Sequence, residues 1–228
     1  MSTTVLGLAG ELAAVEGTPT VAVDATPAGG DLALRGADAR YLPISLQSWL
    51  YGNGGGSAAP LEDCLSRASS GAGLLWRDAA PLRQRATFAA VGEELALAGY
   101  APVYDGGTPI AARQLQPLLA DPDLALVLVI PCRADAANRL RVALEWLDDE
   151  YGDGDGIVSG TTIVVSHQLP EGEPDIGGYL RENLSGWVRD IREIPYDAQL
   201  ARGELVTHSV LADATREAYR KLLAGVSS

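Results

Sequence analysis

The chain has 228 residues, of which 47% are hydrophobic, and a formal net charge of -13 at pH 7. This length and composition suffice for one large core, so we predict a single domain over residues 1–228. The acidic balance argues against nucleic-acid binding and against an anionic membrane surface, because both need clustered basic side chains. No apolar run is long enough to span a membrane and no signal-like segment opens the sequence, so we expect a cytoplasmic protein.

Cysteine and histidine are scarce. The two cysteines, Cys64 and Cys132, are too few and too far apart to suggest a disulfide framework or a metal cluster, and we expect both to be small buried hydrophobes. His167 and His208 do not supply the short spacing of metal ligands. The sequence therefore predicts no metal centre built on these residues.

Hydrophobic spacing predicts helices and strands that alternate along the chain. The expected helices cover residues 3–16, 45–50, 61–68, 83–98, 110–119, 135–149, 176–184 and 213–224. The expected strands cover residues 18–24, 73–76, 101–105, 124–130, 161–166 and 188–194. Continuous apolar strands between helices are typical of an α/β fold with a doubly wound, mostly parallel sheet and helices on both faces.

Two of these strands end in an aspartate that a turn of small residues follows. The stretch VAVDATPAGGD carries Asp24, and APVYDGGTP carries Asp105. We expect both carboxylates at the same edge of the sheet, where α/β proteins bind ligands. The alternative is that both turns are ordinary connections. Two other glycine-rich stretches, GNGGGS at 52–57 and YGDGDG at 151–156, lack phosphate-binding or calcium-binding partners and are expected to be surface turns.

Five stretches in order resemble the MinD/ParA group of P-loop ATPases, in the form found in actinobacteria. They are STTVLGLAGELA, VAVDATPAGGD, YAPVYDGGTP, ALVLVIPCRADAANRLRVALEWL and IREIPYDAQLARGELV, and they span nearly the whole chain. The first is similar to the segment that comes after the phosphate-binding glycines in that group, and the next two are similar to its switch I and switch II elements. The resemblance implies a P-loop NTPase-like fold that lacks the usual first strand and P-loop, with ATP and Mg²⁺ as cofactors.

The resemblance also implies roles at the phosphate end of the site. Ser2 would be the Mg²⁺ hydroxyl, with Thr3 beside it at a helix N-terminus that favours phosphate. Asp105 would hold Mg²⁺ through water, and Asp24 matches the first aspartate of switch I. Asp24 and Asp105 are thus the implied catalytic residues.

At the base end, Ser166 and His167, with Pro195, Tyr196 and the loop to residue 197, fall where the group contacts adenine.

Three positions depart from the pattern. Met1 stands where the P-loop lysine would be, and Lys221 is the only lysine in the chain. Thr26 stands where the second switch I aspartate orients the attacking water, and Ser166 or His167 replaces the usual asparagine. We expect the native frame to continue upstream of Met1. Without the usual first strand, two interior strands would lack a hydrogen-bonding neighbour.

The leading functional prediction is an ATP-dependent, dimerising switch that positions or regulates a cellular machine in partition, division or secretion. ATP hydrolysis, a homodimer and a protein partner follow from the resemblance. One alternative is a degenerate scaffold with the same fold that neither binds nor hydrolyses ATP. Another, a Rossmann enzyme with Asp24 on a ribose, needs a G-x-G-x-x-G turn that the sequence lacks.

Overall fold

The computed structural model describes residues 2–51, 60–83, 87–152 and 156–226. Contacts divide the chain into two compact units, which we describe separately. Unit 1 comprises Met1–Leu118 with Gly203–Leu211, and unit 2 comprises Leu119–Arg202 with Ala212–Ser228. The predicted turn at 52–57 lies outside the described residues, as do residues 153–155 of the turn predicted at 151–156.

The sheet of unit 1 has four strands in the order β2-β3-β1-β4. These are β1 (Thr20–Asp24), β2 (Ser66–Arg67), β3 (Gly73–Leu75) and β4 (Ala101–Asp105). β1 is parallel to both β3 and β4, and β2 pairs antiparallel with β3. Every residue of β1 is buried, as expected of a central apolar strand with a partner on each side and helices on both faces.

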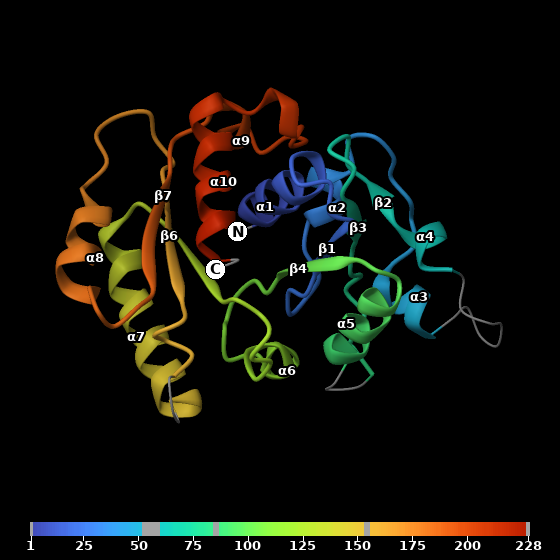
Figure 1. Ribbon diagram of the computed structural model, residues 1–228, viewed down its shortest axis with the longest axis horizontal. Helices are drawn as coiled ribbons and strands as arrows, with labels where there is room; N and C mark the ends of the chain where they lie inside the picture. Colours follow the sequence, from blue (N-terminus) through green and yellow to red (C-terminus); the bar gives the residue numbers. More distant parts are fainter. Residues whose placement is uncertain (1, 52–59, 84–86, 153–155, 227–228) are drawn as a thin grey trace. The chain divides into compact units, whose positions relative to one another are not determined.

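The helices of unit 1 cover both faces of this sheet (Figure 1). They are α1 (Ser2–Ala14), α2 (Leu32–Gly36), α3 (Leu46–Tyr51), α4 (Leu61–Cys64) and α5 (Thr87–Leu97), with the short turns η1 (Arg113–Leu115) and η2 (His208–Val210). α1 and α2 pack together on one face and α5 packs on the other. The segment Gly203–Leu211, which belongs to unit 1, is hydrogen-bonded to α2 because the Val206 N–H donates to the Arg35 carbonyl at 2.6 Å.

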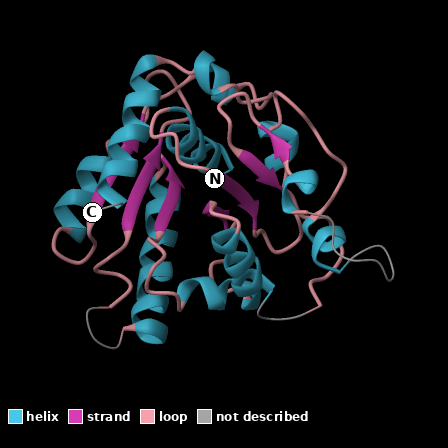
Figure 2. Cartoon of the chain, turned by 45° about the vertical axis from the view of Figure 1, so that its right-hand side comes forward, coloured by secondary structure: helices cyan, strands magenta, loops and turns pink. Residues whose placement is uncertain are grey.

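Unit 2 has three parallel strands in the order β5-β6-β7. They are β5 (Val127–Pro131), β6 (Thr162–Ser166) and β7 (Asp190–Ile194). The helices α7 (Ala134–Tyr151) and α8 (Ile176–Leu184) lie on one face, and α10 (Asp213–Val226) lies on the other, so that this sheet too is enclosed by helices (Figure 2). The short α9 (Ala198–Ala201) follows β7, and α6 (Gln116–Leu119) lies at the boundary of the two units in sequence.

The α/β fold class predicted from the sequence is confirmed, and two predicted helices are corrected. The helix expected at 61–68 ends at Cys64, because Ser66 and Arg67 pair with β3 instead. The helix expected at 110–119 is reduced to η1 and α6, since Pro117 has no N–H and is tolerated only in the first turn of a helix. Elsewhere the predicted elements are present, and the strand at 101–105 and the helix at 176–184 have the predicted bounds.

The described strands form two hydrogen-bonded sheets rather than one. Among the described residues, β4 pairs only with β1 and β5 only with β6, so each sheet has one edge formed by an apolar strand. The single domain over residues 1–228 stays a prediction. Of the helices described, none combines the length and the apolar character needed to cross a membrane.

Candidate nucleotide and magnesium site

Asp24 and Asp105 lie side by side at the carboxyl ends of neighbouring parallel strands. They are the last residues of β1 and β4 and are direct partners in the strand register. Asp24 is fully buried and Asp105 is 2% exposed. The predicted convergence of the two carboxylates at one sheet edge is therefore confirmed.

Ser2, the first residue of α1, reaches this edge. Its Oγ donates a hydrogen bond of 2.6 Å to Asp105 Oδ2. Burial raises the pKa of Asp105 and the nearby charge of Asp24 adds to this, while the hydrogen bond from Ser2 acts in the opposite direction. A hydroxyl and a carboxylate are hard oxygen donors of the kind that Mg²⁺ prefers, so this pair fits the ion that the sequence implied. Thr3 occupies the next position of the same first turn.

Asp24 is held by its own turn. Its Oδ1 accepts from the Thr26 N–H at 3.0 Å and from the Thr26 hydroxyl at 2.6 Å, and its Oδ2 accepts from the Gly30 N–H at 2.7 Å. Gly29 adopts a φ of 80°, which a residue with a side chain rarely takes, so glycine is needed to close the turn. The catalytic role of Asp24 stays a prediction. In the structure, the Asp24 carboxylate accepts the hydrogen bonds that hold its own turn together.

A buried arginine, Arg77, also belongs to this edge and was missed by the sequence analysis. It follows β3 by two residues, is 5% exposed, and donates through Nη1 to the Thr26 carbonyl. The charges of Asp24 and Asp78 lie near its guanidinium. A cation just beyond a buried strand, beside two strands that end in aspartate, was the signal that could have identified it.

The residues predicted at the base end lie together in unit 2. Ser166 ends β6, and the His167 N–H donates to the carbonyl of Ile194, which ends β7 and precedes Pro195 and Tyr196. Their contact with adenine stays a prediction. The phosphate-end residues belong to unit 1.

The ring of His167 is engaged by two carboxylates. Nδ1 lies 2.7 Å from Glu173 Oε2, and Nε2 lies 2.9 Å from Glu193 Oε2. Burial opposes the charged ring, but hydrogen bonds to Glu193 and Glu173 outweigh it and raise the pKa of His167. Cys132 is buried beside this pair, and its Sγ lies within 4.8 Å of one ligand atom of His167 and one of Glu173, a grouping that the sequence analysis did not anticipate. Spacing along the chain missed it because the residues follow different strands.

Comparisons with known proteins address the fold. No family model matches the chain, and no curated protein matches its sequence. Among solved structures, a ParA family ATPase from Chlorobium tepidum TLS aligns with a TM-score of 0.65 and 13% identity, covering 98% of this chain and 86% of that one. The MinD cell division protein of Aquifex aeolicus aligns with a TM-score of 0.61 and 18% identity over 98% and 92% of the two chains. The McdA(D38A)–ATP complex of Cyanothece aligns with a TM-score of 0.59 and 14% identity over 99% and 91%.

The chain thus has an α/β fold like that of the ParA, MinD and McdA proteins. At these identities the likeness establishes the fold alone. A proposal about activity has to be argued from the residues of the site.

Proposed function

We propose that this chain binds ATP together with Mg²⁺ and acts as a nucleotide-dependent dimerising switch for a cellular machine in partition, division or secretion. The observation that carries the proposal is the Ser2–Asp105 hydrogen bond at the start of α1, on a fold shared with positioning ATPases. A helix N-terminus beside a hydroxyl and a buried carboxylate offers partial positive charge to phosphate and oxygen donors to a hard cation.

In this proposal, Mg²⁺ supplies positive charge that offsets the charge of the terminal phosphates. The Ser2 hydroxyl would bind the ion directly, and Asp105 would hold it through water. The N–H groups of the first turn of α1, including that of Thr3, would face the phosphates. Ser166, His167, Pro195 and Tyr196 are the proposed base-end contacts.

Hydrolysis is expected to be slow. Thr26, at the position of the water-orienting acid, uses its hydroxyl to donate to Asp24, and both oxygens of Asp24 are occupied by donors of the same turn. Neither residue therefore offers a free carboxylate oxygen to orient an attacking water. The proposal is for a protein whose nucleotide occupancy, rather than rapid turnover, sets its state.

A non-binding scaffold with the same fold is the second candidate. The observation that favours it is the closed turn around Asp24, which is complete without any ligand. In that case, the buried carboxylates of Asp24 and Asp105 stabilise the fold and take no part in nucleotide binding.

Calorimetry with ATP and Mg²⁺ separates the two candidates. We expect binding that requires Mg²⁺ and is weakened at least about tenfold, or about 1.4 kcal/mol, by Ser2→Ala and by Asp105→Asn. Ser69 and Asp38 provide the matched control, because the Ser69 hydroxyl donates to Asp38 Oδ2 at the same 2.6 Å on the surface of unit 1. Ser69→Ala and Asp38→Asn should leave binding unchanged. Absence of Mg²⁺-dependent binding would favour the scaffold. Equal losses in the control variants would contradict the assignment of Ser2 and Asp105 to the site.

The switch itself is tested by mass measurement in solution. Light scattering with Mg²⁺ should report twice the chain mass when ATP is present and the chain mass without nucleotide. The same mass with and without ATP would contradict the dimerising switch. It would not bear on ATP binding, which calorimetry tests separately. Partner capture with and without ATP then addresses the protein partner.

A further inference from the structure

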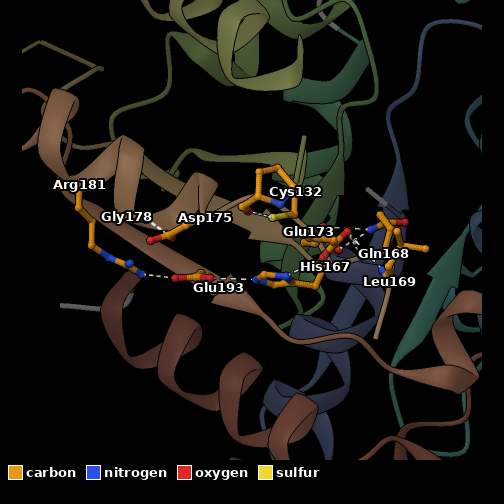
Figure 3. Close-up of polar contacts among 11 residues, drawn as sticks. Cys132, His167, Gln168, Leu169, Glu173, Asp175, Gly178, Arg181 and Glu193 are labelled. Atoms are coloured by element: carbon orange, nitrogen blue, oxygen red, sulfur yellow. Dashed lines mark hydrogen bonds and ion pairs between the residues drawn. The ribbon is translucent and has the colours of Figure 1, made fainter. Parts of the chain in front are cut away.

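Unit 2 brings together a thiol, an imidazole and a carboxylate that the proposed nucleotide function does not use in combination. Cys132 and His167 are the residues directly after β5 and β6, and the Cys132 N–H donates to the carbonyl of Ser166, which extends the pairing of these strands. Glu173 comes from the loop after His167. Because β5 and β6 are adjacent and parallel, their carboxyl ends deliver both side chains to one edge of the sheet (Figure 3).

The candidate ligand atoms lie close enough to share one ion. One atom from each of Cys132, His167 and Glu173 lies within 4.8 Å of the other two. Zinc binds sulfur at about 2.3 Å and nitrogen or oxygen at about 2.0–2.2 Å, which places tetrahedral ligands about 3.3–3.8 Å apart. His167 Nδ1 and Glu173 Oε2, now 2.7 Å apart, would have to separate by about 0.6 Å or more to bind one ion together. A thiolate, an imidazole and a carboxylate form a borderline-soft set that suits Zn²⁺ and Co²⁺ rather than Mg²⁺.

Glu173 is already positioned for such a role. Its side chain is 8% exposed, and its Oε1 accepts the N–H groups of Gln168 at 2.9 Å and Leu169 at 3.2 Å. Its other oxygen, Oε2, therefore points at His167 Nδ1. The loop thus holds the carboxylate in one orientation and leaves one oxygen directed into the cluster.

His167 also has the support that metal-bound histidines require. Its far nitrogen, Nε2, faces Glu193 Oε2 at 2.9 Å, and Arg181 Nη2 donates to Glu193 Oε1 at 2.6 Å. Figure 3 shows this row, with Arg181, Glu193, His167 and Glu173 in sequence across the edge. A carboxylate behind a histidine orients the ring and raises its basicity toward a metal on the other nitrogen. This hydrogen-bonded row is an observation separate from the distances among the three candidate ligand atoms, and it also indicates a metal ion on His167 Nδ1.

The metal-free arrangement satisfies the same groups with protons. The buried thiol of Cys132 donates to the Pro174 carbonyl at 3.2 Å, and a proton lies between His167 and Glu173. A divalent ion would displace both protons and leave the thiolate and the imidazole nitrogen as ligands.

We propose that Cys132, His167 and Glu173 form a binding site for one Zn²⁺-class transition-metal ion, with Glu193 as the residue that orients His167. A water molecule would complete the tetrahedral coordination. The site is distinct from the proposed Mg²⁺ site in chemistry and in the residues it uses.

Titration of the chelator-treated chain with Co²⁺ tests the site directly. We expect one Co²⁺ per chain, with a thiolate-to-cobalt charge-transfer band and the visible absorption of tetrahedral cobalt, and displacement by Zn²⁺. Cys132→Ala should abolish the charge-transfer band. Cys64→Ala, which removes the other buried cysteine, should retain it. Absence of the band, its survival in Cys132→Ala, or its loss in Cys64→Ala would overturn the proposal.

Two further variants keep the test decisive if Cys132→Ala does not fold. Glu173→Gln retains an amide oxygen for the N–H groups of Gln168 and Leu169 but removes the anionic ligand, so Co²⁺ affinity should fall at least about tenfold while circular dichroism is unchanged. Glu193→Gln should weaken binding by about 10–100-fold, as removal of an orienting partner does. Unchanged Co²⁺ affinity in both folded variants would overturn the assignment. Neither result depends on whether the chain binds ATP.

Discussion

Ser2 and Asp105, 103 residues apart in sequence, are joined by a hydrogen bond of 2.6 Å between Ser2 Oγ and Asp105 Oδ2. The bond fixes the first turn of α1 against the end of β4. It also gives a buried carboxylate a donor at the point where the like charge of Asp24 is nearby. One contact thus stabilises the fold and shapes the candidate site.

A double-mutant cycle on Ser2→Ala and Asp105→Ala should give a coupling free energy of about 1.5–3 kcal/mol, because the bond is charge-assisted and Asp105 is buried. The same cycle on the exposed pair Ser69 and Asp38 should give less than about 1 kcal/mol. Urea unfolding followed by circular dichroism measures both. Equal coupling in the two pairs would show that burial adds nothing to the Ser2–Asp105 bond.

Thr26→Asp should destabilise the protein by about 1–3 kcal/mol, because it replaces the hydroxyl that donates to Asp24 with a second carboxylate. The family resemblance suggests this change as a way to restore hydrolysis, but the structure indicates that the turn would have to open first. Thr26→Ser keeps the donor and should lie within about 0.5 kcal/mol of the parent. A stable Thr26→Asp variant in urea unfolding would contradict the closed turn.

Gly10→Ala should destabilise unit 1 by about 1–3 kcal/mol, although alanine normally favours a helix over glycine. A Cβ at Gly10 would lie 2.6 Å from His208 Cδ2, and His208 Nε2 is held 2.9 Å from the buried Glu11. Gly225 in α10 is the matched control, since its nearest neighbour, Arg192 Nη2, would be 3.6 Å away. Gly225→Ala, near the end of α10, should change the stability by less than about 0.5 kcal/mol. Thermal unfolding that ranks the two variants in the opposite order would refute the packing argument.

Asp197→Ala should cost about 1–2 kcal/mol at neutral pH, because Oδ1 caps α9 through the Gln199 N–H and Oδ2 accepts the Ala212 N–H that precedes α10. Burial opposes its charge, yet these hydrogen bonds, that of Ala212 foremost, lower the pKa of Asp197 below its ordinary value of 3.8. The folded state thus favours the ionised form. Its stabilisation is complete above the ordinary pKa and is lost as pH falls through the lowered one.

The difference between the parent and Asp197→Ala in urea unfolding should accordingly shrink at acid pH. The exposed Asp123 serves as control, and Asp123→Ala should change stability by less than about 0.5 kcal/mol at every pH. A difference that stays constant from neutral to acid pH would contradict the assigned role of Asp197.

The alternation of helices and strands could be predicted from the sequence, as could the end of two strands at Asp24 and Asp105. Both depend on local periodicity and on residue types that favour strands and turns. The pairing of residues 66–67 with β3 could not be predicted, because a two-residue strand has no period and its partner is set by packing. The closed turn around Asp24 and the hydrogen bond from Arg77 to Thr26 could not be predicted either, because both are set by packing.

The sequence by itself determined the α/β class and the two carboxylates that face one sheet edge. Only the tertiary structure decided that Cys132, His167 and Glu173 lie close together, because that depends on the adjacency of β5 and β6 and on a register that pairs Pro131 with Ser166. Periodicity reports which face of an element is buried. Strand order and register arise from the packing of the whole chain, and they decide which distant side chains meet.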